Sequence, residues 1–486
     1  MTAMAIRNVS GVAPVLAASL DQKKSLWWDY GVMAFCVLHI PLALLLAKSA
    51  TLSTVHGVVA FAIGVWMALT STKRPERVAY AAAYMVGSEV LWRMTHSQVF
   101  WEFGKYSVAA IFLVAIFRSH RLKGPALVFG YFALLIPSIG FLMMRTGLLG
   151  ARSYVSAFLS GPLALMASAW FFSRIKLTME ELQRIFLVAI GPIIGIATVT
   201  FFGIYSAKEI SFTGSSNFAT SGGFGPNQVS SALGLGALFA LLLLLLSKRN
   251  QTLKIFLLLA MLLLAVQSAL TFSRGGLYNV GGAIAIASVY FLRDSRTRRT
   301  LFFLVVTIVL VGSFVILPRL DKFTGGALEA RFANTNTTNR SDIALEELYL
   351  FLNYPVLGVG PGGSKFAHVS TAHTEFARMP AEHGIPGLIS LILLLIAAAE
   401  AIKKAKSSKS KAIAVSLVVW SFLYMLNAAM RLVAPSFVFG LAFATILPEA
   451  TPRLALLYAI LRHKLQARLG ARRRPWSSAA GFSQIR

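Results

Sequence analysis

The chain alternates between long apolar runs and short polar connections. About 20 consecutive apolar residues suffice for a membrane-spanning helix, and shorter runs can span where neighbouring helices bury them. We identify fourteen candidate spans: 28–47, 53–71, 78–93, 106–117, 125–144, 154–173, 185–205, 229–247, 253–272, 276–292, 300–317, 385–399, 412–430 and 433–448. The run at 106–117 is the weakest of them. The pattern therefore predicts an all-α polytopic membrane protein with about 12–14 transmembrane helices.

Composition supports this interpretation. The 486 residues are 57% hydrophobic and 13% charged, whereas roughly 25% of the residues in soluble domains are charged. The single cysteine, Cys36, lies inside the first apolar run. One cysteine excludes a disulfide framework and a cysteine-based metal cluster.

The charged residues are mostly basic, with 46 Lys and Arg against 18 Asp and Glu. In a soluble protein this excess would indicate nucleic-acid binding. Here the basic residues lie in short loops, as the orientation signals of membrane proteins do. If the N-terminus is cytoplasmic, every basic cluster falls on the cytoplasmic side; the clusters are 73–77, 118–123, 174–184, 248–254, 293–299, 403–411 and 462–474. We therefore expect both termini in the cytoplasm, a lipid bilayer as partner and no nucleic acid.

The predicted organisation places two sizeable loops on the outer face. The segments are a cytoplasmic N-terminus at 1–27, helices 1 to 11 at 28–317 with an outer loop near 206–228, a large outer loop at 318–384, helices 12 to 14 at 385–448, and a basic cytoplasmic tail at 449–486. The large loop carries six basic and seven acidic residues, so it is nearly neutral. A long loop among short connections usually carries function, and we expect the active site there.

The large loop contains one amphipathic segment. Residues 341–352 predict a short helix, capped by Asn339 or Ser341, with acidic residues early, where the helix dipole favours them. Its predicted apolar side consists of Ile343, Leu345, Leu348, Phe351 and Leu352. We expect this helix to lie on the membrane surface or on the ends of the spans.

Two further segments of the loop have recognisable patterns. Residues 358–363 match GxGxxG, but the dinucleotide fingerprint needs a preceding strand and a following helix. We therefore expect a tight turn and no nucleotide site. Residues 371–387 predict a short polar helix that leads into the next span and is kinked or ended at Pro380.

Several motifs in this order resemble the O-antigen ligase family, which includes polysaccharide polymerases and protein O-oligosaccharyltransferases. They are Ser273-Arg274-Gly275-Gly276 at the end of a span, Arg340 before the loop helix, Tyr354-Pro355-x-x-Gly358-x-Gly360, and Glu382-His383-Gly384-Ile385-Pro386-Gly387 after His373. Upstream, Gly225-Pro226-Asn227 is similar to a segment of polymerase-like members. The usual His-Asn pair of the family is His373-Thr374 here. The detailed resemblance covers about residues 200–390.

The resemblance implies a GT-C-like fold and a periplasmic active site in a bacterial inner membrane. Members transfer a preassembled glycan from undecaprenyl diphosphate to an acceptor hydroxyl, on a saccharide or on lipid A-core, in lipopolysaccharide, O-antigen or exopolysaccharide biosynthesis. Guanidinium groups suit a diphosphate leaving group because they grip phosphate oxygens in a bidentate fork. By resemblance, Arg274 and Arg340 hold the leaving group and His373 is the general base. The implied reaction needs no metal or other cofactor and inverts the anomeric centre.

Other residues are secondary candidates. Possible substrate-binding residues are Arg431, Lys208, Arg93, Glu375 and Glu382. An arginine at the end of a span can also have no role in substrate binding and simply extend its charged group to the membrane–water interface. The sequence leaves ligase and polymerase open, and a lipid-linked-sugar flippase or other transporter is the main alternative class. Glu89 and Arg93 inside the third span favour that alternative, whereas the absence of an internal repeat disfavours it.

Overall fold

The computed structural model describes residues 29–119, 122–207, 209–212, 215–246, 250–334, 340–366 and 374–448. This structure is 80% helical, which confirms the predicted all-α polytopic membrane fold. Among the described residues, nine helices are long and apolar enough to cross a membrane. The described residues from Asp29 to Ile446 belong to one compact unit.

The helices follow one another with short connections. The first half contains Asp29–Ala47, α2 (Ala50–Thr70), α3 (Glu76–Met94), α4 (Phe103–Arg118), α5 (Ala126–Ala133), α6 (Pro137–Phe172), α7 (Met179–Ser206), the 3-10 turn η1 (Ala219–Ser221) and α8 (Pro226–Leu246). The second half contains α9 (Gln251–Leu270), α10 (Gly275–Phe291), α11 (Ser295–Val311), the π-helical turn η2 (Gly312–Ile316), α12 (Leu317–Thr324), α13 (Ala327–Ala333), α14 (Arg340–Asn353), the 3-10 turn η3 (Gly363–Phe366), α15 (Glu375–Lys404), α16 (Ser408–Ala428) and α17 (Ala434–Leu441).

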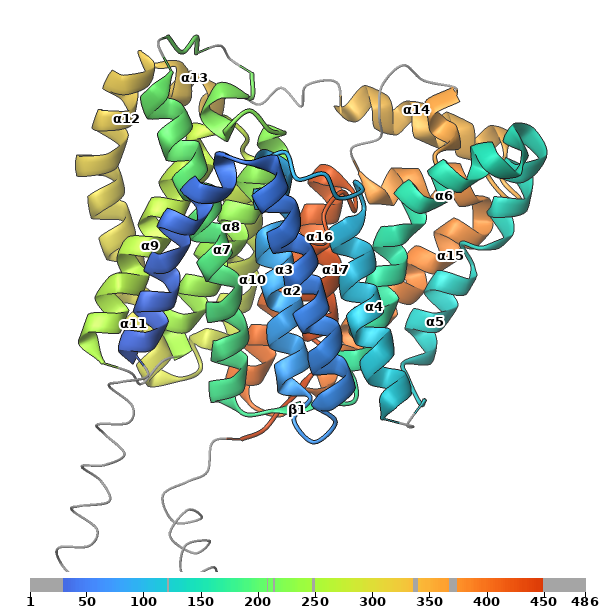
Figure 1. Cartoon of the computed structure of the whole chain (residues 1–486), viewed down its shortest axis with the longest axis horizontal. Coiled ribbons are helices and arrows are strands. Elements are labelled where there is room, and N and C mark those ends of the chain that lie inside the picture. Colours follow the sequence, from blue (N-terminus) through green and yellow to red (C-terminus); the bar gives the residue numbers. More distant parts are fainter. Residues whose placement is uncertain are drawn as a thin grey trace, which may run out of the picture. The chain divides into compact units, whose positions relative to one another are not determined.

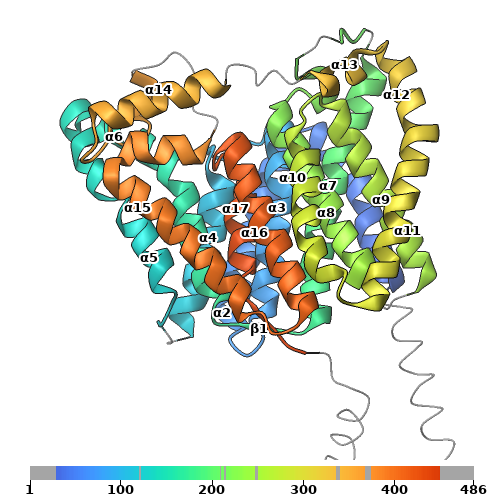
Figure 2. The same cartoon turned by 180° about the vertical axis from the view of Figure 1, so that it is seen from behind.

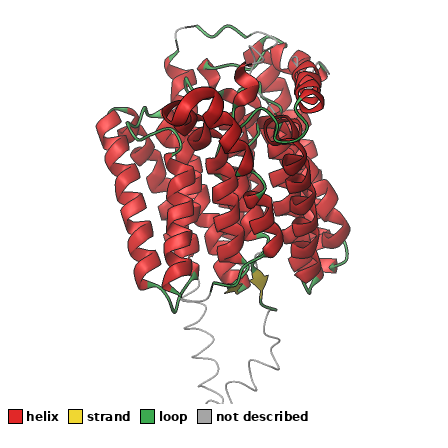
Figure 3. Cartoon of the chain, turned by 90° about the vertical axis from the view of Figure 1, so that its right-hand side faces the viewer, coloured by secondary structure: helices red, strands yellow, loops and turns green. Residues whose placement is uncertain are grey.

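The compact unit has two distinct ends. At one end, which we call the β1 end, β1 (Lys176–Leu177) pairs in parallel with β2 (Thr445–Ile446) (Figures 1 and 3). At the opposite end, which we call the α14 end, α13 and α14 cover the long helices (Figures 1 and 2). The long helices run between these two ends, so successive connections alternate between them.

The centre of the bundle is α8. Every residue from Val229 to Leu246 is buried, as expected for a helix that is apolar on all sides. Glycines allow α8 and α10 to pack closely, because a Cβ on Gly276 would lie 2.1 Å from the carbonyl oxygen of Ser230. A Cβ on Gly234 would likewise lie 2.5 Å from the carbonyl oxygen of Gly276. This close contact fixes the start of α10, which Arg274 immediately precedes.

The structure differs from the sequence prediction at the α14 end. The helix that begins at Ser295 continues past the predicted boundary at residue 317 to Thr324, with the π-helical turn inside it. The amphipathic helix is present as α14, but Leu345 and Leu352 on its predicted apolar side are exposed. The buried residues of α14 are Ile343, which belongs to the predicted apolar side, and Glu347 and Leu350, which do not.

The predicted kink at Pro380 is wrong. Pro380 lies within α15, and the helix is interrupted at Gly384, where φ is 64° and ψ is −147°. Glycine adopts this left-handed conformation without steric cost. A Cβ at Gly384 would also lie 2.5 Å from the carbonyl oxygen of Pro355. The interruption therefore depends on a contact with a distant segment and on the missing side chain.

Candidate functional site

Two sequence motifs meet at the start of α10. The Ser230 hydroxyl donates to the Ser273 carbonyl (2.8 Å) and accepts from the Gly276 N–H (3.2 Å). The Ser273 hydroxyl donates to the amide oxygen of Asn227 (2.7 Å). The Gly225-Pro226-Asn227 segment at the start of α8 therefore holds the Ser273–Gly276 segment in place. Arg274 lies within this fixed backbone.

The short helix α13 docks onto the same segment. Arg331 Nε donates to the carbonyl oxygen of Phe272 (3.1 Å), and the Arg274 guanidinium donates to the carbonyl oxygen of Asn334. Phe272 has φ of 57°, a left-handed conformation that is uncommon for a bulky residue. Such conformations cluster at functional sites, where surrounding contacts maintain them.

Four arginines from separate elements lie near one another at the α14 end, and we call them the arginine cluster: Arg274, Arg331, Arg340 and Arg431. Burial lowers the pKa of Arg340, and the charges of Arg274, Arg431 and Arg331 lower it further. Burial and the charge of Arg274 also lower the pKa of Arg331. Guanidinium groups stay protonated in proteins, so the cluster concentrates positive charge. The structure thus brings the two predicted leaving-group arginines, Arg274 and Arg340, together with the predicted substrate-binding Arg431.

The segment that carries Arg431 has an unusual backbone. Ala429, two residues earlier, has φ of 51° and ψ of −156°. This region is close to one that essentially only glycine occupies, and it costs about 1–3 kcal/mol for other residues. Nothing in the local sequence indicates this strain, because alanine is a common residue in helices.

Arg93, predicted to bind substrate, is engaged in contacts within the protein. Its guanidinium donates to Glu89 (2.7 Å), the Gln228 side chain (2.8 Å), the Trp101 carbonyl (3.1 Å) and the Arg431 carbonyl (3.4 Å). It also lies over the Trp101 ring, 4.6 Å from the ring centroid. These contacts tie α3 to the start of α8 and to the connection between α16 and α17. Arg93 is therefore placed to fix the backbone of Arg431.

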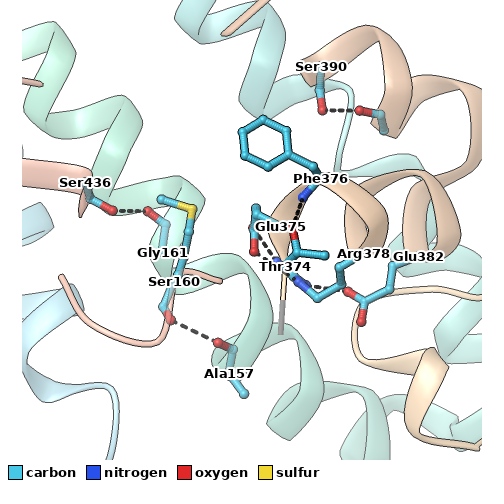
Figure 4. A network of polar contacts seen from close by, with 12 residues as sticks. Ala157, Ser160, Gly161, Thr374, Glu375, Phe376, Arg378, Glu382, Ser390 and Ser436 are labelled. Carbon is cyan, nitrogen blue, oxygen red and sulfur yellow. Dashed lines mark hydrogen bonds and ion pairs between the residues drawn. The ribbon is translucent and has the colours of Figure 1, made fainter. Parts of the chain in front are cut away.

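Glu375 and Glu382, also predicted to bind substrate, both face Arg378. The buried Arg378 donates to Glu375 at 2.5 and 3.2 Å and to Glu382 at 2.5 Å (Figure 4). Both carboxylates are almost completely buried. Buried charges require such pairing, so the three side chains form a compact ion-pair network inside α15.

The glycine-rich segment 358–363 is a tight turn that packs on α15. Its Val359 N–H donates to the Ala381 carbonyl (3.0 Å), and its Gly360 N–H donates to the Glu382 carbonyl (2.9 Å). Gly358, Gly360 and Gly362 all have positive φ. The Ser364 hydroxyl then donates to the buried Glu347 of α14 (3.0 Å). The turn therefore connects α14 to the interrupted part of α15.

Two predicted site residues, His373 and Lys208, lie outside the described residues. The next residue after His373, Thr374, accepts a hydrogen bond from the Phe376 N–H (3.3 Å) and caps α15. His373 thus immediately precedes the capped end of α15 in the sequence, and its role stays a prediction.

Sequence reasoning missed three cations that the structure brings to this end. They are Arg331 in the arginine cluster, Arg378 in the ion-pair network, and the buried Lys105 of α4. The spacing of Glu375, Arg378 and Glu382 was a usable signal, because residues three and four apart face one another on a helix.

Comparison with protein families agrees with the motif resemblance. Residues 259–392 match the model of the O-antigen ligase family. No curated protein matches the chain. The matched segment contains Arg274, Arg331, Arg340 and the turn at 358–363, whereas Arg431 and Lys105 lie outside it. The match supports an O-antigen ligase-like family, glycan transfer of the ligase type and a multi-pass membrane protein.

Proposed function

We propose that this protein is a periplasmic-face glycosyltransferase that moves a glycan from undecaprenyl diphosphate to an acceptor hydroxyl. The product is a ligated or polymerised O-antigen or exopolysaccharide. The observation that carries the proposal is the arginine cluster, in which the half-buried Arg340 lies beside three other arginines. Concentrated guanidinium groups suit a lipid diphosphate, which carries its negative charge on closely spaced oxygens.

The distribution of basic loops supports the proposed orientation. Lys409, in the first turn of α16, pairs with Asp294 between α10 and α11 (3.7 Å). Lys176 forms part of β1, and basic residues precede α3. Because these connections gather at the β1 end and Lys and Arg favour cytoplasmic loops, we assign the β1 end to the cytoplasm. The arginine cluster at the α14 end then faces the periplasm.

The proposed reaction is a single displacement. His373 removes the proton from the acceptor hydroxyl, and that oxygen attacks the anomeric carbon of the donor glycan. The bond between the anomeric carbon and the diphosphate oxygen breaks, and the electron pair leaves on the diphosphate. Arg274 and Arg340, with Arg431 and Arg331 beside them, stabilise the developing charge. A direct attack of this kind inverts the anomeric centre.

The proposal is tested in the native host by deletion and complementation. Wild-type, His373→Ala and His368→Ala genes are introduced into the deletion strain, and membrane levels of each protein are measured. Surface polysaccharide and the lipid-linked pool are then separated on gels. We expect wild type and His368→Ala to restore long-chain glycan and His373→Ala to fail at equal protein level.

The accumulated intermediate distinguishes the two acceptor types. Long chains on undecaprenyl diphosphate indicate a ligase, and single lipid-linked repeats indicate a polymerase. Full complementation by His373→Ala would contradict the proposed chemistry and favour a transporter, which needs no general base.

A further inference from the structure

A second polar pocket lies beside the arginine cluster. It has a volume of about 370 Å³, and we call it the Lys105 pocket. Its main lining side chains are Trp101, Lys105, Phe158, Lys365, Arg378 and Arg431. Arg431 also acts electrostatically on Arg340, so it belongs to both the pocket and the arginine cluster. The volume lies within the roughly 300–1,000 Å³ that is usual for small-molecule sites.

Lys105 is the most unusual residue of this pocket. Its side chain is only 2% exposed, and within the described residues its hydrogen bond is a long one, 3.5 Å to the Ala157 carbonyl. An ammonium group has three donors, and burying it without partners is costly. The nearby carboxylate of Glu89 is engaged by Arg93 and by the Val433 N–H. A buried cation that lines a pocket in this way is suited to receive an anionic group from a ligand.

The pocket combines these charges with aromatic surfaces. The Phe158 ring lies near two cations: Lys365 Nζ is 5.2 Å and Arg378 Cζ 5.1 Å from the ring centroid. Trp101 is 58% exposed. Aromatic rings offer flat apolar faces, against which the C–H face of a pyranose can pack.

The charge balance of the lining favours an anion. Glu102 is the acidic residue of the lining, whereas Glu375 and Glu382 pair with Arg378 and do not line the pocket. The ammonium groups of Lys105 and Lys365 together carry one charge more than the carboxylate of Glu102. A neutral sugar would leave this excess without compensation, whereas a sugar with a carboxylate or phosphate would offset it.

We propose that the Lys105 pocket binds an anionic sugar residue of the acceptor glycan, next to the donor diphosphate held by the arginine cluster. This inference rests on the proposed function and specifies the chemical class of its acceptor. Lys105 and Lys365 contact the anionic group, and Trp101 and Phe158 contact the sugar ring. Arg431, shared by both sites, lies where the acceptor approaches the donor.

The test is a binding measurement on the purified full-length protein in lipid nanodiscs. Isothermal titration calorimetry compares tetragalacturonic acid, glucose 6-phosphate, maltotetraose and inorganic phosphate. We expect one of the two anionic sugars to bind at least tenfold more tightly than maltotetraose and than inorganic phosphate. Lys105→Met, which keeps the length of the side chain, and Lys365→Met at the exposed rim should each weaken this binding at least tenfold. Lys322→Met, which removes an exposed cation from α12, should leave it unchanged.

Three outcomes would overturn the inference. They are equal affinity for the anionic sugars and maltotetraose, equal affinity for the anionic sugars and inorganic phosphate, and unchanged binding in both lysine variants. The exposed position of Lys365 keeps the test valid even if Lys105→Met fails to fold. Binding without glycan transfer in the host would support the pocket and contradict the proposed function. Loss of complementation by His373→Ala together with absent sugar binding would contradict the pocket alone.

Discussion

Two arginines at the α14 end, the buried Arg378 and the half-buried Arg340, differ in their neighbours. Arg378 in α15 is held by two carboxylates of its own helix, at 2.5 Å each. The charges that act on Arg340 in α14 are those of three other arginines, and they lower its pKa. The charge of Arg378 is thus compensated by carboxylates, whereas Arg340 belongs to a group of positive charges.

This difference in neighbours distinguishes an arginine that stabilises the fold from arginines that we propose to bind a ligand. A buried charge that is compensated inside the protein contributes to the fold, and removing its partner leaves an uncompensated charge. A group of like charges is costly to assemble, and an anionic ligand of the kind that we propose would offset that cost. We therefore expect substitutions at Arg378 to affect stability first and substitutions in the arginine cluster to affect transfer first.

The largest expected effect is that of Arg378→Ala on stability. It leaves Glu375 and Glu382 buried without their cation, which typically costs about 3–5 kcal/mol. Fluorescence-detected size-exclusion chromatography after heating in detergent should show a clearly lower melting temperature. Adding Glu375→Gln and Glu382→Gln to Arg378→Ala should restore part of the loss. An unchanged melting temperature in the single variant would show that the network does not stabilise α15.

The sequence alone predicted the helical membrane fold and three of the four arginines of the arginine cluster. Apolar runs predict helices in a membrane because the backbone has no other way to satisfy its hydrogen bonds there. Arg274, Arg340 and Arg431 were chosen as candidates from their positions, and the structure brings them together. Whether they bind substrate is what the variants test.

The remaining features depend on contacts between distant segments. Arg93 was expected to bind substrate, yet its guanidinium is engaged by Gln228, 135 residues away, and by the Arg431 carbonyl. The burial of Lys105 and the strained conformation of Ala429 likewise follow from packing that local patterns do not encode. The network of Arg378 was predictable in principle, because it needs only a helix that continues through Pro380.

The next effect is that of Arg340→Ala on transfer. Removing one preorganised donor to a developing negative charge typically lowers the rate about 10²–10³-fold. Arg340→Lys keeps the charge but loses the bidentate fork, so we expect an intermediate loss. Surface polysaccharide in the complemented deletion strain, normalised to membrane protein level, measures both.

Arg319→Ala is the matched control for this comparison. Arg319 is an exposed arginine of α12, outside the arginine cluster. Its removal should leave transfer unchanged. Equal transfer by Arg340→Ala and Arg319→Ala would show that the arginine cluster has no special role in transfer. The proposed difference between Arg340 and Arg378 would then be wrong.

A smaller effect should come from the packing beneath the cluster. Gly276→Ala forces a Cβ to within 2.1 Å of the Ser230 carbonyl oxygen, so α10 must shift and move Arg274. Overpacking of this kind costs about 1–3 kcal/mol. A Cβ at Gly281, in the same helix, meets nothing within 4 Å, so Gly281→Ala should be neutral or slightly stabilising. Melting temperature and transfer, measured for both variants, should fall only for Gly276→Ala.

The most direct test of the central claim is the binding of undecaprenyl diphosphate to the purified full-length protein. Native mass spectrometry of wild type, Arg340→Ala and Arg319→Ala, with undecaprenyl monophosphate as the competing lipid, measures whether the arginine cluster recognises the diphosphate. We predict that wild type and Arg319→Ala prefer the diphosphate to the same extent, and that Arg340→Ala binds it at least tenfold more weakly. Equal diphosphate binding by all three proteins would contradict the account.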